Sequence, residues 1–147
     1  TGIQNRANDT AVQSDLTNFA GKIREYEATE GQFPAGGTAY GTSLQATVGV
    51  GKFSLARNSY RTTVNNNFYY CRGIVAGVDK FGVIAVSASG QIYAYRSDIG
   101  AVRPISGTWA TGWTNGTICP TAGIPTSATS YTYSTGYVDG VWGSWNQ

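Results

Sequence analysis

Apolar residues recur at helical spacing near the start of the chain. They lie four, three, four and three positions apart, which places them on one face of a helix. The pattern predicts a helix over residues 9–30, with Asn8, Asp9 or Thr10 as its N-cap and Gly31 as its stop. Gly21 within it indicates the close approach of another backbone. The apolar face predicts packing on a flat apolar surface through Val12, Leu16, Phe19, Ile23 and Tyr26.

Strand-like patterns follow in the middle of the chain. A first strand is expected over 68–78, with a turn at Asp79–Lys80, and a second over 81–87. Ser89–Gly90 is a two-residue turn signal before a third strand that contains Ile92, Tyr93 and Tyr95. Short connections force neighbouring strands to be antiparallel, so we expect a meander. Side chains at 69, 71, 73 and 75 share one of its faces.

The remaining segments carry weaker patterns. Residues 35–66 are Gly-rich and are interpreted as a long loop, with one short strand near 44–50 and a turn at Asn65–Asn67. Residues 104–147 hold all four Trp and are expected to be ordered by aromatic packing and turns, with a hairpin turn at Asn115–Gly116. We therefore predict one α+β domain over 1–147: a helix and turn (1–34), a loop region, a meander of three to four antiparallel strands (67–103) and the C-terminal region.

Composition narrows the function classes. Charged residues make up 12% of the chain and the net charge is +2, which is too weak for a dedicated nucleic-acid binder. The chain has no His, so the usual general base and the usual neutral metal ligand are missing. Two Cys, at 71 and 119, in a Gly-, Thr- and Tyr-rich chain favour a secreted domain with one disulfide. Composition thus favours an extracellular protein that is not an enzyme and has no cofactor.

The acidic residues do not form a convincing catalytic or metal site. Glu25, Glu27 and Glu30 lie on the predicted solvent side of the helix. A carboxylate pair that includes Asp79, Asp98 or Asp139 would suit a glycoside hydrolase, but the sequence offers no spacing rule for it. A calcium site shared by the loops of Asp98 and Asp139 remains an alternative.

Two groups of residues are candidates for binding. Arg57, Arg61 and Arg72 lie among aromatic residues in a segment without acidic residues, a pattern that can hold single-stranded DNA, although an ordinary mildly basic surface is the simpler interpretation. The aromatic C-terminal region suits a glycan or protein ligand, or else forms the core of a region poor in aliphatic residues. Its candidate contact residues are Trp109, Trp113, Trp142, Trp145 and Tyr137.

The N-terminal residues resemble a known family. The run Gln4-Asn5-Arg6-Ala7-Asn8-Asp9-Thr10-Ala11-Val12-Gln13-Ser14-Asp15-Leu16, then Ile23-Arg24-Glu25-Tyr26 and Gly31-Gln32-Phe33-Pro34, is similar to the type IV pilins and the pseudopilins of type II secretion. The order of helix, Gly-rich loop, meander and Cys-tethered tail also resembles the head domain of that family. The specific match covers about residues 4 to 34.

The resemblance implies a structural role. It implies a subunit of an extracellular bacterial filament, anchored in the membrane before assembly, that serves adhesion, twitching motility, DNA uptake or secretion. Its partners would be other pilin subunits, in a homo- or hetero-polymer. The family's apolar N-terminal helix half and its peptidase site are not in this sequence, and the absence of Met leads us to expect that they were removed. The alternative is a stand-alone secreted module that recognises a glycan through the Trp/Tyr-rich region.

Overall fold

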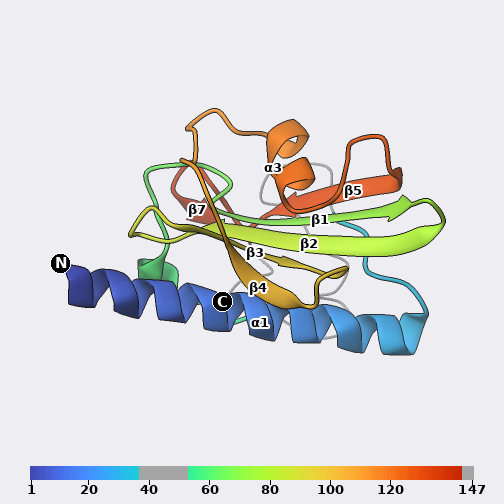
Figure 1. Cartoon of the computed structure of the whole chain (residues 1–147), viewed down its shortest axis with the longest axis horizontal. Coiled ribbons are helices and arrows are strands. Elements are labelled where there is room, and N and C mark those ends of the chain that lie inside the picture. The colour runs from blue at the N-terminus through green and yellow to red at the C-terminus, as the bar shows by residue number, and fades with distance from the viewer. Residues whose placement is uncertain (37–52, 144–147) are drawn as a thin grey trace.

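The fold is α+β. The computed structural model describes residues 1–36 and 53–143. Its elements follow in the order α1 (Gly2–Glu30), η1 (Arg57–Ser59), β1 (Phe68–Val75), β2 (Val78–Val86), β3 (Ile92–Arg96), β4 (Ala101–Ile105), α3 (Asn115–Thr121), β5 (Thr129–Thr135), β6 (Tyr137–Val138) and β7 (Val141–Trp142). In Figure 1, α1 lies along one face of the main sheet and α3 lies on the opposite side.

The main sheet has five antiparallel strands in the order β4-β3-β2-β1-β5. The predicted meander is present as β1 to β4, but the prediction of three to four strands was too low. The fifth strand comes from the Thr-, Ser- and Tyr-rich segment 129–135, which pairs with β1 and leaves β1 in the interior of the sheet. β6 and β7 form a separate two-stranded ribbon.

The turn between β1 and β2 lies earlier than the sequence indicated. Val75 pairs with Val78, so Ala76 and Gly77 form the two-residue loop, with φ angles of 51° and 79°. Two central residues with positive φ are typical of a type I′ turn, whose twist matches that of the flanking strands. The predicted turn residues Asp79 and Lys80 are instead in β2.

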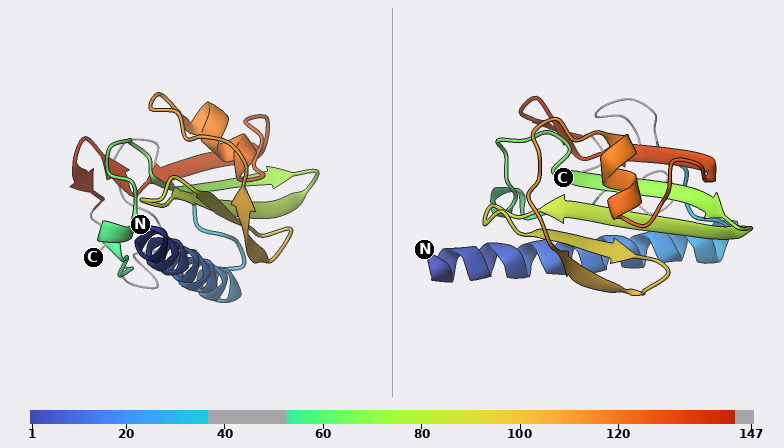
Figure 2. Two further views of the ribbon diagram at one scale, coloured as in Figure 1. Left: turned by 60° about the vertical axis from the view of Figure 1, so that its left-hand side comes forward. Right: turned by 45° about the horizontal axis from the view of Figure 1, so that its top comes forward.

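Helix α1 packs on the sheet through the predicted face. All five residues of the apolar stripe are buried, in one cluster with Phe68, Tyr70 and Val83 of the strands. The helix begins at Gly2, with the Thr1 hydroxyl accepting a hydrogen bond from the Gln4 amide, so the predicted caps at residues 8–10 were wrong. It ends at Gly31, which adopts the left-handed conformation as predicted. Figure 2 shows α1 nearly end-on beside the sheet.

Gly21 does not bring another backbone close to α1. A Cβ atom built at this position would have no neighbouring atom within 4 Å, and the residue is exposed. The expected close approach is therefore wrong.

The opposite face of the sheet is covered by the C-terminal part of the chain. Cys71 of β1 and Cys119 of α3 form the predicted disulfide, with their Cα atoms 5.6 Å apart. Both cysteines are fully buried in a second cluster with Ile84, Ile118 and Ile124. The sheet is thus buried on both sides, by α1 on one and by the disulfide-tethered segment on the other.

Two further expectations concern local elements. The Asn65–Asn67 turn is present, whereas the predicted hairpin turn at Asn115–Gly116 is wrong because these residues begin α3. The predicted strand near residues 44–50 lies outside the described residues. Within residues 1–36 and 53–143, no helix is sufficiently long and apolar to cross a bilayer.

Candidate functional site

The aromatic residues proposed as a ligand surface are mostly part of the interior. Trp109 is 3% exposed and Tyr137 is buried, with the Tyr137 hydroxyl donating to the Thr62 carbonyl at 2.9 Å. Trp113 is half-buried and its ring centre lies 4.9 Å from that of Trp109. For Trp109 and Tyr137 the structure therefore favours the alternative that they belong to the core, and Trp113 packs beside Trp109.

Trp142 is also held by its neighbours. This half-buried ring packs edge-on against Tyr60 and Tyr137, and the Arg57 guanidinium lies 5.7 Å from its centre. Trp145, the remaining candidate, lies outside the described residues.

The three candidate arginines do not form a nucleic-acid surface. Arg72 is 6% exposed and donates two hydrogen bonds to Asp79, at 2.8 and 3.2 Å. Its pKa is raised above the usual arginine value, chiefly by the hydrogen bond to Asp79. Arg57 lies against Trp142, and Arg61 lines a separate cleft beside Gly90. A DNA contact shared by all three is therefore contradicted, because a buried and paired Arg72 cannot reach a phosphate.

The acidic candidates are dispersed. Asp98 forms a bidentate pair with Arg96, which lowers the pKa of Asp98, and Asp139 accepts a hydrogen bond from Asn65 at 3.2 Å. Glu25 and Glu30 are exposed and Glu27 is half-buried. Among the residues that the structure describes, no three His, Cys, Asp or Glu side chains gather in a way that could hold a metal ion.

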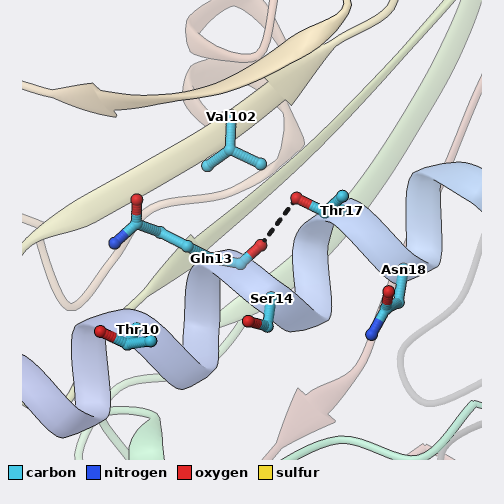
Figure 3. A pocket seen from close by; sticks show the side chains of 6 residues that line it. All are labelled: Thr10, Gln13, Ser14, Thr17, Asn18 and Val102. Atoms are coloured by element: carbon cyan, nitrogen blue, oxygen red, sulfur yellow. Dashed lines mark hydrogen bonds between the residues drawn. The ribbon is translucent and has the colours of Figure 1, made fainter.

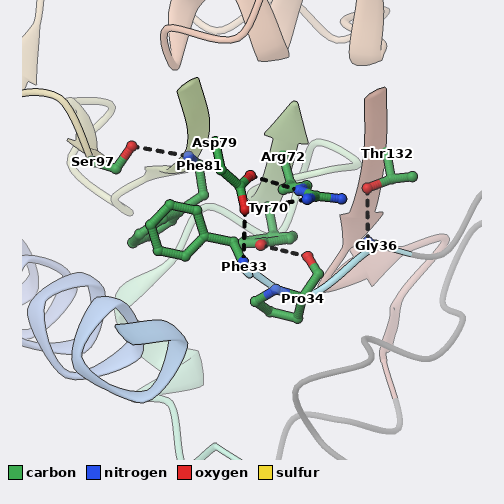
Figure 4. Close-up of polar contacts among 9 residues, drawn as sticks. All are labelled: Phe33, Pro34, Gly36, Tyr70, Arg72, Asp79, Phe81, Ser97 and Thr132. Carbon is green, nitrogen blue, oxygen red and sulfur yellow. Dashed lines mark hydrogen bonds and ion pairs between the residues drawn. The ribbon is translucent and has the colours of Figure 1, made fainter. Parts of the chain in front are cut away.

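An Asp79 cluster fixes the chain where it leaves α1. Figure 4 shows Asp79 of β2 between Arg72 of β1 and the backbone of Phe33, whose N–H donates to Asp79 at 2.9 Å. The Tyr70 hydroxyl donates to the Pro34 carbonyl at 2.7 Å, and Phe33 packs edge-on against Phe81. Asp79 was predicted to lie in a turn, and the sequence gave no signal for its contact with Phe33, which is 46 positions away.

A second carboxylate holds the middle of the helix. Asp15 of α1 accepts hydrogen bonds from the Tyr60 hydroxyl at 2.7 Å and from the Ala56 backbone N–H at 2.9 Å. Burial raises the pKa of Asp15, and these two hydrogen bonds partly oppose that rise. Burial and the nearby Asp15 also raise the pKa of Tyr60. Asp15 thus joins α1 to η1.

The exposed side of α1 carries a shallow polar groove. It has a volume of about 610 Å³ and runs between the helix and strand β4. Figure 3 shows small and polar side chains along the helix with Val102 of β4 opposite; the Thr17 hydroxyl donates to the Gln13 carbonyl at 3.0 Å. Because these side chains are short, another backbone can approach this face closely. The lining residues are Thr10, Gln13, Ser14, Thr17, Asn18 and Val102.

No family model, curated protein or solved structure matches this chain. The candidate surfaces are therefore judged on their own geometry and chemistry.

Proposed function

We propose that this protein is a structural subunit of an extracellular filament of the type IV pilus kind, and not an enzyme. The observation that carries the proposal is the way α1 extends beyond the sheet. Its burial begins at Asn8, whereas its first two turns are exposed and Ile3 is 82% exposed. In Figure 1 this end of the helix projects past the strands. A helix that serves only its own core has no need of these turns.

The rest of the fold supports this role. One face of α1 is fixed to the sheet, while the opposite face presents the short side chains Ser14, Thr17 and Asn18. A subunit built in this way can pack helix against helix at the small interaxial distance that short side chains permit. The disulfide and the two-sided burial of the sheet give a head that tolerates exposure outside the cell.

Three of the described carboxylates have partners that fit a structural role. The described carboxylates Asp15, Asp79 and Asp98 are each engaged by donors from the protein itself. Carboxylates that accept hydrogen bonds from the protein in this way stabilise the fold. The expected neighbours of this subunit are further copies of the chain or related subunits.

The test uses the full gene product in the cells that produce it. Filaments sheared from these cells should carry the protein, as seen by immunogold electron microscopy. Asn18→Arg places a long charged side chain on the exposed helix face and should abolish the labelled filaments. Thr111→Arg, at an exposed position beyond β4, is the matched control and should retain them.

Thermal unfolding separates assembly from folding. Both variants should unfold within a few degrees of the wild type, since surface substitutions usually change stability by less than about 0.5 kcal/mol. Wild-type cells without labelled filaments, or filaments that persist in Asn18→Arg, would contradict the proposal.

A further inference from the structure

A polar cleft of about 490 Å³ lies beside the first turns of α1, on a different part of the surface from the groove. Its walls come from the helix, from the segment after η1, from the β2–β3 turn and from the end of β4 and the residues after it. The volume is within the range of small-molecule sites, roughly 300 to 1,000 Å³. The residues that carry its chemistry are Asp9, Arg61, Ser89, Gly90 and Gln91.

The Arg61 guanidinium is available for a ligand. Among the described residues, no carboxylate lies within ion-pair distance of it, and its side chain makes no hydrogen bond. It nevertheless has a defined place: a Cβ atom on Gly90 would lie 2.9 Å from its Nη2 atom. Gly90 has a φ of 95°, so both its backbone and the space beside it favour glycine. A half-buried guanidinium without a partner is well suited to bind a carboxylate through two parallel hydrogen bonds.

The cleft also carries acceptors that are fixed by the protein. The Ser89 hydroxyl donates to the Asp9 carboxylate at 2.6 Å. A carboxylate offers about four acceptor positions, so Asp9 can still accept from a ligand hydroxyl.

The side chain of Gln91 is also held by hydrogen bonds within the protein. Its Nε2 donates to the Ile92 carbonyl at 2.9 Å and to the Ile105 carbonyl at 3.1 Å. Both amide protons are thereby used, and the side-chain oxygen keeps its acceptor capacity. The acceptors of the cleft are therefore preorganised by bonds within the protein.

The cleft suits a ligand that combines one carboxylate with several hydrogen-bond donors, and sugar hydroxyls are such donors. Arg61 would take the carboxylate, and Asp9 and Gln91 would accept from hydroxyls. A neutral sugar would leave Arg61 without its partner. We propose that the cleft binds an acidic sugar residue, of the hexuronic or sialic acid class. This inference is independent of filament assembly.

Titration followed by NMR tests the proposal. Glucuronic acid and N-acetylneuraminic acid, added to about 10 mM, should shift the backbone amide signals of Gly90 and Gln91. Glucose, which lacks the carboxylate, should produce shifts at least about tenfold weaker at equal concentration, because a charge-assisted bidentate pair is lost. Glycine serves as a zwitterion with a carboxylate but no hydroxyl.

Variants assign the contact to Arg61. Arg61→Gln should weaken binding of the acidic sugars by at least about tenfold, while Arg103→Gln, on the exposed part of β4, should not. Since the Arg61 side chain has no hydrogen-bond or ion-pair partner among residues 1–36 and 53–143, Arg61→Gln should unfold at the wild-type temperature. Equal binding of glucose, tighter binding of glycine, absence of shifts with either acidic sugar, or unchanged binding by Arg61→Gln would each overturn the proposal.

Discussion

The close approach of α3 to the sheet depends on the absence of a side chain at Gly82. Gly82 lies in the middle of β2, and a Cβ atom added there would overlap the carbonyl oxygen of Ala122 at the end of α3. The glycine is needed for space, since its backbone conformation is one that other residues adopt.

Gly82→Ala should therefore destabilise the protein by about 1–3 kcal/mol, the usual cost of overpacking. Gly112→Ala is the matched control, because no atom lies within 4 Å of its added Cβ. Urea unfolding of the two variants measures the difference. Equal stabilities would show that α3 does not sit against β2 as described.

A single residue, Asp15, makes the stability of the protein depend on pH. Burial raises its pKa in the folded state above the ordinary carboxyl value. Between the unfolded and the folded pKa, the folded chain binds a proton that the unfolded chain has released. Stability contributed by Asp15 is therefore larger at acid pH and decreases as pH rises through that window.

Asp15→Asn removes this titration. The free energy of unfolding of the wild type, measured relative to Asp15→Asn, should decrease as pH rises above about 4, the ordinary carboxyl pKa. Urea unfolding at several pH values provides the measurement. A difference that increases over this range would mean that hydrogen bonds from Tyr60 and Ala56 outweigh burial.

At the scale of elements, the disulfide is the covalent link between β1 and α3. It closes a separation of 48 positions. In the chain-entropy model a loop of that size stabilises by about 4 kcal/mol. The double variant Cys71→Ser, Cys119→Ser should lose a comparable free energy of unfolding, and the reduced wild type should melt at a similar temperature. Two thiols that can be alkylated in the native, unreduced protein would contradict the assignment.

Local patterns predicted most of these elements. The apolar stripe from Val12 to Tyr26 and the glycine stop at Gly31 specify α1 through neighbours three and four positions away. The alternation in β1 correctly separated Tyr69 and Cys71 from Phe68 and Tyr70 on the other face. In both cases the signal lies within a few residues of sequence.

Contacts between residues far apart in the sequence were not predicted. Strand β5 carries only Tyr131 and Tyr133 at alternate positions, among Thr and Ser, which is a weak strand signal. Its partner β1 is far away in sequence, so no local pattern showed that it joins the sheet. The cleft around Arg61 was hidden for the same reason, because it combines residues of the helix with distant segments. The Arg72–Asp79 pair spans only seven positions, and it was missed because Asp79 was assigned to a turn and not to β2. The burial of Trp109 was undecided because aromatic residues suit both a core and a surface.

At the scale of the whole molecule, Asp79 ties three segments together. It pairs with buried Arg72 of β1 and accepts from Phe33, just after α1. Asp79→Ala should cost about 3–5 kcal/mol, since it leaves a buried cation unpaired.

A double variant tests whether the loss of stability in Asp79→Ala comes from the unpaired charge of Arg72. The double variant Arg72→Met, Asp79→Leu removes both charges and should be markedly more stable than Asp79→Ala. Thermal unfolding of the three proteins makes the comparison. If Asp79→Ala melts at the wild-type temperature, the cluster contributes nothing to the attachment of α1.

The position of β5 has a consequence for how fast the molecule folds. Strands β1 to β4 pair with their neighbours along the chain, whereas Cys71 must meet Tyr133 before β5 can join β1. Pairings between distant residues slow folding because the intervening chain must close first. An intact bond between Cys71 and Cys119 shortens that search, so oxidised protein should refold faster from urea than reduced protein. The Cys71–Cys119 disulfide would then increase the folding rate as well as the stability of the folded protein.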